Sequence, residues 1–246
     1  MFKGNPVRGV NYLLRGFKLL LSPKLRLFVV VPLAINTLIF SVLLYLTFDY
    51  INGWVDNFFG WIPDWLNFLD WIIWPFIITS VLLVSGYLFT IVAVMIASPF
   101  NSLLAEKAEE LVTGESVDGL EGFSGALLAI PMSVGRELKK LLYYLPLLLL
   151  VLILSFIPPF TLLAPVLWFV LGAWMMGIQY CDYPLDNNRK SFKELKNKLR
   201  LQRLTSLGFG GIVSLISAIP VVNFIVMPAA VCGAVLYWCE DLKQQS

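Results

Sequence analysis

The hydrophobic residues of this chain gather into four long stretches without a charged side chain, at residues 27–48, 71–105, 141–181 and 204–239. A helix needs about 20 apolar residues to cross the roughly 30 Å hydrocarbon core of a bilayer. The first two stretches therefore predict two long transmembrane helices. Pro32 falls near the beginning of the first stretch, so we expect it in the first turns of that helix, where proline is tolerated.

The third and fourth stretches are interrupted by proline, which breaks or kinks a helix. Pro158 and Pro159 divide the third stretch, whereas Pro220 and Pro228 divide the fourth, so each stretch predicts a helical hairpin. The first arm of the fourth stretch, residues 207–219, would be about 20 Å long as a helix, shorter than the bilayer core. The pattern is compatible with a hairpin that dips partly into the membrane and returns. Protein would then have to cover its turn, and an oligomer is one way to do so.

Two polar segments carry apolar residues at helical spacing and are expected to lie as helices on the membrane surface. The first is residues 2–20 and the second is residues 189–203, and in both the remaining positions are rich in Lys and Arg. Anchoring to anionic lipid headgroups accounts for this pattern. Gathering of anions is a second interpretation.

Composition favours a membrane protein, because 59% of the residues are hydrophobic and 14% are charged, against roughly 25% charged in soluble domains. We predict one membrane domain over residues 1–246, in which residues 1–26 form an amphipathic segment before the first span. The predicted fold class is an all-α integral membrane protein with two long transmembrane helices, two proline-broken hairpins and surface helices. A net charge of +2 gives no indication of nucleic-acid binding, and residues 1–26 lack the cleavage site of a signal peptide.

The charges of the loops predict how the chain is oriented. Residues 1–26 hold six Lys or Arg and no acid, whereas residues 49–70 hold four Asp and no base. Because cytoplasmic loops are enriched in Lys and Arg, we expect the N-terminus in the cytoplasm and residues 49–70 on the opposite face. Residues 182–203, with seven Lys or Arg and three acids, are then cytoplasmic, as is the C-terminus. The bias is weaker at residues 106–140.

The residue types that are missing limit the chemistry. There is no histidine, no nucleotide-binding motif and no CxxC pair, and three scattered cysteines fit neither a disulfide framework nor a zinc site. We therefore expect no catalytic residue, no metal, no cofactor and no enzymatic activity. Acids within spanning segments usually accompany proton coupling, and none interrupts the four stretches, so a passive, channel-like route fits better. Proton-coupled transport is the alternative, because helix tilting could bring Glu106, Glu109 or Glu137 into a pore. The cysteines are Cys181, Cys232 and Cys239.

The sharpest local pattern stands just before the first span, at residues 22–26, called here the 22–26 turn. Ser22 is a good N-cap and Pro23 suits the first helical position. The following backbone N–H groups and the positive end of the helix dipole favour an anion there. Lys24 and Arg26 add charge, and the Arg26 guanidinium matches oxyanions. The alternative is a capped helix with snorkelling basic residues. The candidate anion-binding residues are Ser22, Pro23, Lys24, Leu25 and Arg26.

Two further polar groups flank the apolar stretches. The first is a candidate pore mouth or gate, and ion pairs that stabilise helix packing are an equally weighted explanation. The second is residues 179–187, which follow an apolar arm, and there we expect a sharp turn in which Asp182 accepts hydrogen bonds from backbone N–H groups. The candidate pore or gate residues are Asn101, Glu106, Glu109, Glu110, Arg136 and Glu137.

Several sequence blocks, spread along the chain in order, are similar to signatures of the CysZ sulfate transporters. The resemblance covers essentially the whole chain at similar length. These blocks are residues 63–66 (PDWL), 97–106 (ASPFNSLLAE), 164–168 (APVLW), 179–184 (QYCDYP) and 227–234 (MPAAVCGA).

The resemblance implies sulfate uptake across the bacterial inner membrane, feeding sulfate assimilation and cysteine biosynthesis. It also implies a homo-oligomer in contact with lipid, and a sulfate site at the turn before the first long helix, which is the 22–26 turn. The chain departs from the family pattern here. Lys24 stands where a glycine often follows the proline, and Leu27 stands where a second adjacent base is expected.

The sequence is compatible with two functions in different classes. The first is a channel or facilitator for sulfate. The second is a membrane protein that does not itself transport, but is a partner or regulator of another transporter. Sulfate flux through the purified protein alone separates the two.

Overall fold

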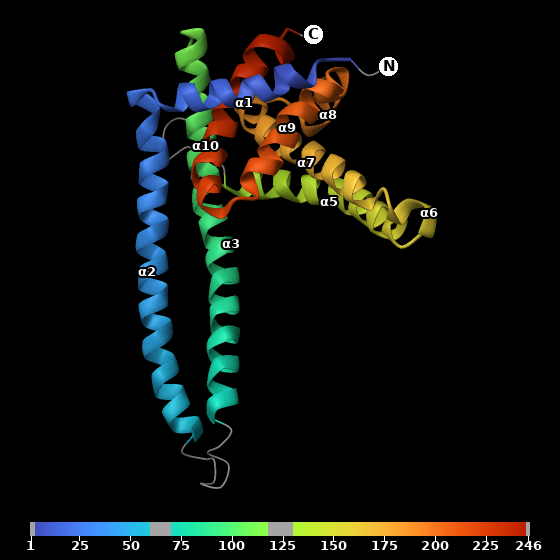
Figure 1. Cartoon of the computed structure of the whole chain (residues 1–246). Helices are drawn as coiled ribbons and strands as arrows, with labels where there is room; N and C mark the ends of the chain where they lie inside the picture. Colours follow the sequence, from blue (N-terminus) through green and yellow to red (C-terminus); the bar gives the residue numbers. More distant parts are fainter. Residues whose placement is uncertain (1–2, 60–69, 118–129, 245–246) are drawn as a thin grey trace. The chain divides into compact units, whose positions relative to one another are not determined.

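The computed structural model describes residues 3–59, 70–117 and 130–244. Within these residues the chain forms helices and no strand, so the predicted all-α fold class is confirmed. The elements are α1 (Pro6–Leu20), α2 (Pro23–Phe59), α3 (Asp70–Thr113), α5 (Ile130–Ser155), α6 (Pro158–Thr161), α7 (Ala164–Asn187), α8 (Phe192–Leu201), α9 (Arg203–Ser217), α10 (Pro220–Tyr237) and the π-helical turn η2 (Trp238–Leu242) (Figure 1).

Four helical segments among the described residues are long and apolar enough to cross a membrane. They begin within α2, α5, α7 and α10, and α9 is apolar but shorter. Length and composition thus support a protein that crosses the membrane several times. The segments are Pro23–Leu46, Gly135–Ser155, Ala164–Asn187 and Val222–Leu242.

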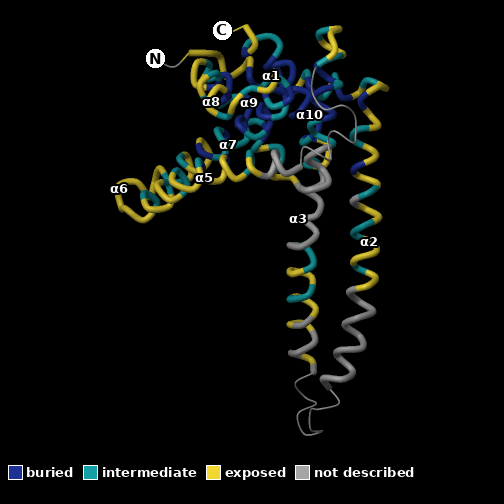
Figure 2. Tube along the Cα trace, turned by 180° about the vertical axis from the view of Figure 1, so that it is seen from behind, coloured by how far each residue is buried: buried dark blue, intermediate teal, exposed yellow. Residues whose placement is uncertain are grey.

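The chain divides into two compact units, Val30–Ser98 on the one hand and Met1–Val29 with Pro99–Ser246 on the other. In the first unit, parts of α2 and α3 run side by side in both views (Figures 1 and 2). These helices extend past the uncharged stretches that predicted them, because a charged side chain does not interrupt backbone hydrogen bonding. Since α2 already begins at Pro23, Pro32 lies in its interior, and the expected place in the first turns was wrong.

The core of the second unit lies where α1 crosses α9 and α10. Tyr12 and Leu13 of α1 are buried, and the Tyr12 ring stacks on Tyr237 with 5.0 Å between ring centroids. Figure 2 shows the buried segments gathered here and at the adjoining end of α7. The amphipathic segment at residues 2–20 therefore forms a helix, as predicted, and one of its faces packs on protein.

Polar contacts fix α1 on the C-terminal turn η2. Arg8 Nη2 lies 2.7 Å from Asp241 Oδ1, and the Tyr12 hydroxyl donates to Asp241 Oδ2 at 3.0 Å. Arg15 Nη1 donates to Glu240 Oε2 at 2.9 Å. Burial and the nearby Asp241 carboxylate raise the pKa of Tyr12 well above its ordinary value, so Tyr12 stays a neutral donor.

Small residues let the helices of this core approach closely. A Cβ added at Gly16 would lie 2.2 Å from the Ala229 carbonyl oxygen of α10. A Cβ added at Gly210 would lie 1.9 Å from the Ala173 carbonyl oxygen of α7. These obstacles are backbone atoms that no side-chain rotation can move, so α1 and α9 need glycine at these crossings.

The third apolar stretch forms the hairpin α5–α7, in which α6 makes the turn at Pro158 and Pro159 as predicted. Hydrogen bonds join its arms, because Trp168 Nε1 donates to Ser155 Oγ and Trp174 Nε1 donates to the Tyr143 hydroxyl, both at 3.1 Å. The tip is exposed in Figure 2, with Phe156 80% and Leu162 88% exposed. Such apolar exposure suits a tip that lies in apolar surroundings and not in water.

Two proline positions differ from expectation. The helix breaks before Pro220, as predicted, but Pro228 lies inside α10 without ending it. Helix α7 likewise continues through Pro184 to Asn187, so the sharp turn expected at residues 179–187 was wrong. A proline removes one backbone donor, and packing on both helices evidently outweighs that loss.

We expect Gly16→Ala to lower the free energy of unfolding by about 1–3 kcal/mol, because the added methyl overpacks a backbone contact. Thermal or denaturant unfolding in detergent micelles, followed by circular dichroism, measures the change. The control is Gly135→Ala in α5, where an added Cβ meets no atom within 4 Å. Equal effects of the two substitutions would contradict the close crossing of α1 and α10.

Candidate functional site

The 22–26 turn joins α1 to α2 and exposes the first turn of α2. The Leu21 and Ser22 N–H groups donate to Lys18 and Leu19 carbonyls at 3.2 and 3.1 Å, which closes the end of α1. The Leu25 N–H donates to the Ser22 carbonyl at 3.1 Å, and Leu25 itself is buried. The first N–H groups of a helix have no partner within it, so this turn offers backbone donors at the positive end of α2.

Three basic side chains surround this turn and are exposed: Lys18, Lys24 and Arg26. None of them forms an ion pair with a described residue. Arg26 Nε donates to the Leu21 carbonyl at 2.9 Å. This bond holds the guanidinium over the turn while its two terminal nitrogens remain available for an oxyanion.

Ser22 behaves differently from the expected N-cap. Its Oγ is buried and has no hydrogen-bond partner among the described residues. Asn5, in contrast, caps α1 by accepting a hydrogen bond from the Val7 N–H at 2.9 Å. Since a buried hydroxyl without a partner costs about 1–3 kcal/mol, the Ser22 hydroxyl is a donor that a bound anion could satisfy.

The second set of candidate residues is divided among several groups of ion pairs. The largest group joins the two arms of the hairpin α5–α7 at its base. Arg136 of α5 donates from Nε to Asp182 Oδ1 at 2.8 Å and from Nη1 to the Lys190 carbonyl at 2.9 Å. It also contacts Asp186 through Nη1. Arg136 Nη2 lies 2.7 Å from the same Asp182 oxygen without hydrogen-bond geometry.

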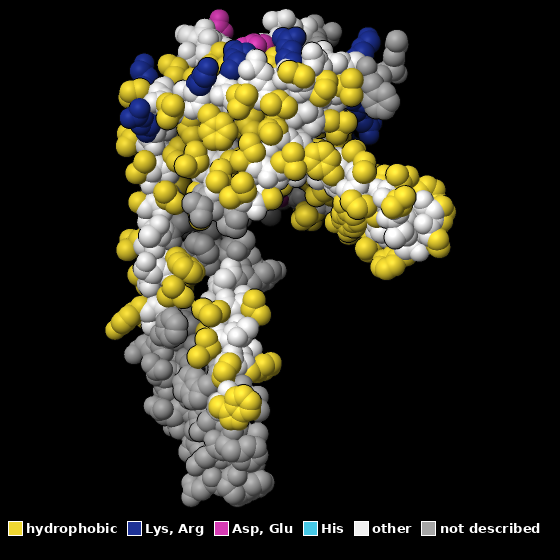
Figure 3. All heavy atoms as spheres, viewed as in Figure 1, with side chains coloured by type: hydrophobic (Ala, Val, Ile, Leu, Met, Phe, Trp, Pro, Cys, Tyr) yellow, Lys and Arg dark blue, Asp and Glu magenta, His cyan; other side chains and the backbone are white. Residues whose placement is uncertain are grey.

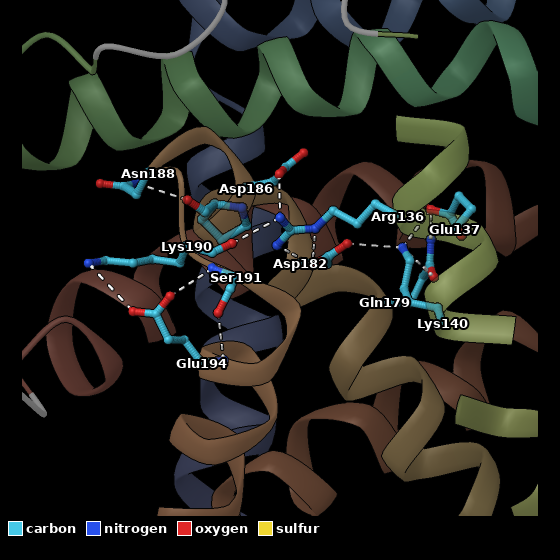
Figure 4. A network of polar contacts seen from close by, with 11 residues as sticks. Arg136, Glu137, Lys140, Gln179, Asp182, Asp186, Asn188, Lys190, Ser191 and Glu194 are labelled. Carbon is cyan, nitrogen blue, oxygen red and sulfur yellow. Dashed lines mark hydrogen bonds and ion pairs between the residues drawn. The ribbon is translucent and has the colours of Figure 1, made fainter. Parts of the chain in front are cut away.

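Lys140, one turn further along α5, completes this group. Its ammonium contacts Glu137, lies 3.1 Å from Asp182 Oδ2 and donates to Gln179 Oε1 at 3.1 Å. Lys140 is only 2% exposed and Asp182 only 5%, so these charges are buried and paired. We call this set the hairpin-base network (Figure 4); its members are Arg136, Glu137, Lys140, Gln179, Asp182 and Asp186.

Glu109 lies in a separate buried cluster, lined on one side by a cavity of about 330 Å³. Its Oε1 accepts from Trp238 Nε1 at 3.1 Å and lies 3.5 Å from Lys243 Nζ. Its Oε2 accepts from Asn188 Nδ2 at 2.8 Å. Glu109 therefore contacts the residue that follows α7, the turn η2 and the C-terminal Lys243.

The remaining candidates lie beside these groups on α3. Glu106 and Glu110 both pair with Lys107, at 3.3 and 2.8 Å. The hydrogen bond to Glu110 raises the pKa of Lys107 above its ordinary value, although burial opposes this rise. Asn101 Nδ2 lies 3.4 Å from the Tyr183 hydroxyl. The structure thus joins Arg136 and Glu137 in one network but distributes the other four candidates over three groups.

Comparison with known proteins decides the family. A family model described as sulfate transporter CysZ/etoposide-induced protein 2.4 matches residues 12–228. Curated relatives named sulfate transporter CysZ include a Pseudomonas fluorescens protein, 48% identical over 95% of this chain and 93% of its own length. A Pseudomonas aeruginosa relative of the same name is 44% identical, with 95% of each chain covered. The chain belongs to the CysZ sulfate-transporter family.

Membership of the CysZ family covers both the 22–26 turn and the hairpin-base network, since the match runs through both. Together with the four apolar helices, it makes this chain a multi-pass membrane protein of a transporter family. It also confirms the resemblance from which sulfate was predicted.

Asp182 is the central member of the hairpin-base network, and its partners differ from those that the sequence predicted. It was expected to accept from backbone N–H groups, but it pairs with Arg136 and Lys140. The sequence holds a signal for this pairing, because Arg136 precedes Pro159 by as many residues as Asp182 follows it. A hairpin that turns at Pro159 brings these two positions opposite each other.

We expect Asp182→Asn to destabilise this CysZ family member by about 3–5 kcal/mol, because the buried Lys140 and the partly buried Arg136 lose their shared carboxylate. Unfolding of the purified protein in detergent measures the loss. Glu110→Gln is the matched control, since its pair with Lys107 is partly exposed and such a pair contributes at most about 1 kcal/mol. A similar small loss in both variants would contradict the buried network.

Proposed function

We propose that this protein admits sulfate across the bacterial inner membrane, in a channel-like or facilitated way, and that the 22–26 turn first binds the ion. The observation that carries the proposal is a cluster of exposed cations beside the buried Ser22 hydroxyl, none of which has an acidic or hydrogen-bonding side-chain partner among the described residues. The family name and the names of the relatives point to the same ion. Uptake of this kind would supply sulfate assimilation and cysteine biosynthesis.

The donors at the 22–26 turn match the chemistry of sulfate. Sulfate is a dianion whose four oxygens accept hydrogen bonds and which carries no proton to donate at neutral pH. The turn offers N–H groups, the Ser22 hydroxyl, the Lys24 ammonium and the Arg26 guanidinium. All are donors, and no described carboxylate pairs with the two cations. Lys24 compensates in charge for the second base that the family pattern places next to Arg26.

We also propose which residues lie along the path beyond this turn. Asn101, Arg136 and Glu137 retain their proposed role at a pore or gate, as do Glu106, Glu109 and Glu110. The acids among them would repel sulfate unless cations neutralise them, and each is paired with a base. The same pairs also hold helices together, so a pore through this region requires that some of them separate.

The hairpin α5–α7 supports partial penetration of the membrane. The charge-free part of α5 runs from residue 141 to Ser155, which is about 22 Å of helix against a core of about 30 Å. The N-terminal end of this charge-free part adjoins the hairpin-base network, whose charges do not enter the lipid core. We therefore propose that this hairpin enters and returns on one side, that both termini are cytoplasmic, and that homo-oligomerisation covers its turn.

Purified protein reconstituted in liposomes should take up radiolabelled sulfate without ATP.

Arg26→Ala should weaken sulfate binding roughly tenfold or more, because a hydrogen bond to a charged group contributes about 1.5–3 kcal/mol. The sulfate affinity of Arg26→Lys should fall between those of the wild type and Arg26→Ala, since lysine keeps the charge but lacks the planar guanidinium. Isothermal titration of the detergent-solubilised protein measures the affinity, and initial uptake rates measure transport.

Lys193→Ala is the control for charge removal, because Lys193 is an exposed base on α8, away from the 22–26 turn. Its sulfate affinity should equal that of the wild type. Uptake that is absent under every imposed pH and sulfate gradient would favour the partner or regulator function. Uptake with unchanged affinity in Arg26→Ala would move the binding site elsewhere.

A further inference from the structure

A groove of about 250 Å³ lies between the hairpin α5–α7 and the junction of α8 with α9. Its floor is apolar and aromatic, and its rim carries two arginines. The floor comes from α5, α7 and α9, and the rim from the end of α8 and the first residue of α9. The lining residues are Tyr143, Val170, Trp174, Leu207, Arg200 and Arg203.

Arg200 and Arg203 are both exposed, and neither forms an ion pair or side-chain hydrogen bond with a described residue. No acidic residue of the described part of the chain lines the groove. Lys196 adds positive charge nearby, with its ammonium 4.5 Å from the centre of the Tyr143 ring. The rim is thus an uncompensated cationic site, and its two guanidinium groups suit the oxygens of a phosphate.

The floor beneath this rim is suited to hydrocarbon. Trp174 Nε1 donates to the Tyr143 hydroxyl at 3.1 Å, so the indole N–H is already satisfied and the two rings present apolar surface. Val170 is 44% exposed one turn closer to the hairpin tip. Figure 3 shows hydrophobic side chains covering the hairpin α5–α7, with Lys and Arg gathered along the edge of this unit where α1 and α8 lie.

The depth of the groove agrees with a lipid headgroup. From Leu163 at the hairpin tip, Trp174 lies about 16 Å along α7, which is close to half of a roughly 30 Å hydrocarbon core. A tip near the middle of the bilayer therefore places Trp174 and Tyr143 at the interface, where Trp and Tyr side chains are enriched. Arg200 and Arg203, beside them, then stand at the level of the phosphates.

We propose that this groove binds one anionic phospholipid, with its phosphate held by Arg200 and Arg203 and an acyl chain packed along Val170, Trp174 and Leu207. The charge of the rim selects an acidic headgroup, and the apolar floor selects a lipid over a free anion. The proposal requires the hairpin to enter the membrane but does not depend on sulfate transport.

The test is native mass spectrometry of the purified protein in a neutral detergent, with phosphatidylglycerol or phosphatidylcholine added. Wild-type protein should retain one phosphatidylglycerol per chain in preference to phosphatidylcholine. The double variant Arg200→Ala/Arg203→Ala should bind phosphatidylglycerol about 25-fold more weakly, because each basic residue near an anionic lipid contributes on the order of fivefold. The control Lys139→Ala/Lys193→Ala removes two exposed charges outside the groove and should bind normally.

A second pair of variants tests the apolar floor without changing charge. Val170→Phe fills the groove and should also weaken phosphatidylglycerol retention, whereas Val166→Phe, one turn closer to the tip and outside the lining, should not. Loss of retention in both groove variants with both controls normal supports the proposal. Equal loss in the lysine control, equal retention of both lipids, or displacement of phosphatidylglycerol by millimolar sulfate would overturn it.

Discussion

The structure depends on one constraint, that a charge buried at the base of an apolar helical hairpin must be paired. Asp182 meets this constraint for both Arg136 and Lys140 and so joins the two arms of the hairpin α5–α7 at its base. A buried ion pair adds little net stability over a well-packed apolar alternative, yet breaking it by removing one partner is costly. Its physical effect is therefore positional, because the arms can meet in few other registers without leaving a charge unpaired.

The same rule underlies both proposed anion sites, because each contains cations that no described carboxylate neutralises. Arg136 and Lys140 are neutralised by carboxylates, whereas Arg26 and Lys24 have no described acid beside them. Arg200 and Arg203, which line one groove, likewise have no ion-pair partner among the described residues. The two places differ in what surrounds the charge. At the 22–26 turn, helix N–H groups and a hydroxyl surround the cations, which suits a small oxyanion. At Arg200 and Arg203, aromatic rings lie beneath the cations, which suits a lipid.

The sequence was sufficient for the helices but not for the side-chain contacts. Long uncharged stretches and Pro158, Pro159 and Pro220 predicted the spans and the breaks, since these depend on local backbone chemistry. Pro228 was misjudged because packing on α10 outweighs one lost hydrogen bond. The spread of the pore candidates over separate ion pairs could not be predicted, because it depends on how α3, α7 and η2 meet. The 22–26 turn was found as a pattern, but its serine does not cap the helix.

Exposure of the 22–26 turn also fits what an entry site for a transported ion must do. A permeating ion has to bind well enough to enter and weakly enough to leave. Lys24 and Arg26 stand in solvent, where charge interactions are screened over about 8 Å at physiological salt, so an ion bound at the proposed site would dissociate quickly. A buried site with unpaired cations would retain a dianion strongly. The hairpin-base network avoids that outcome because its own carboxylates already neutralise its buried cations.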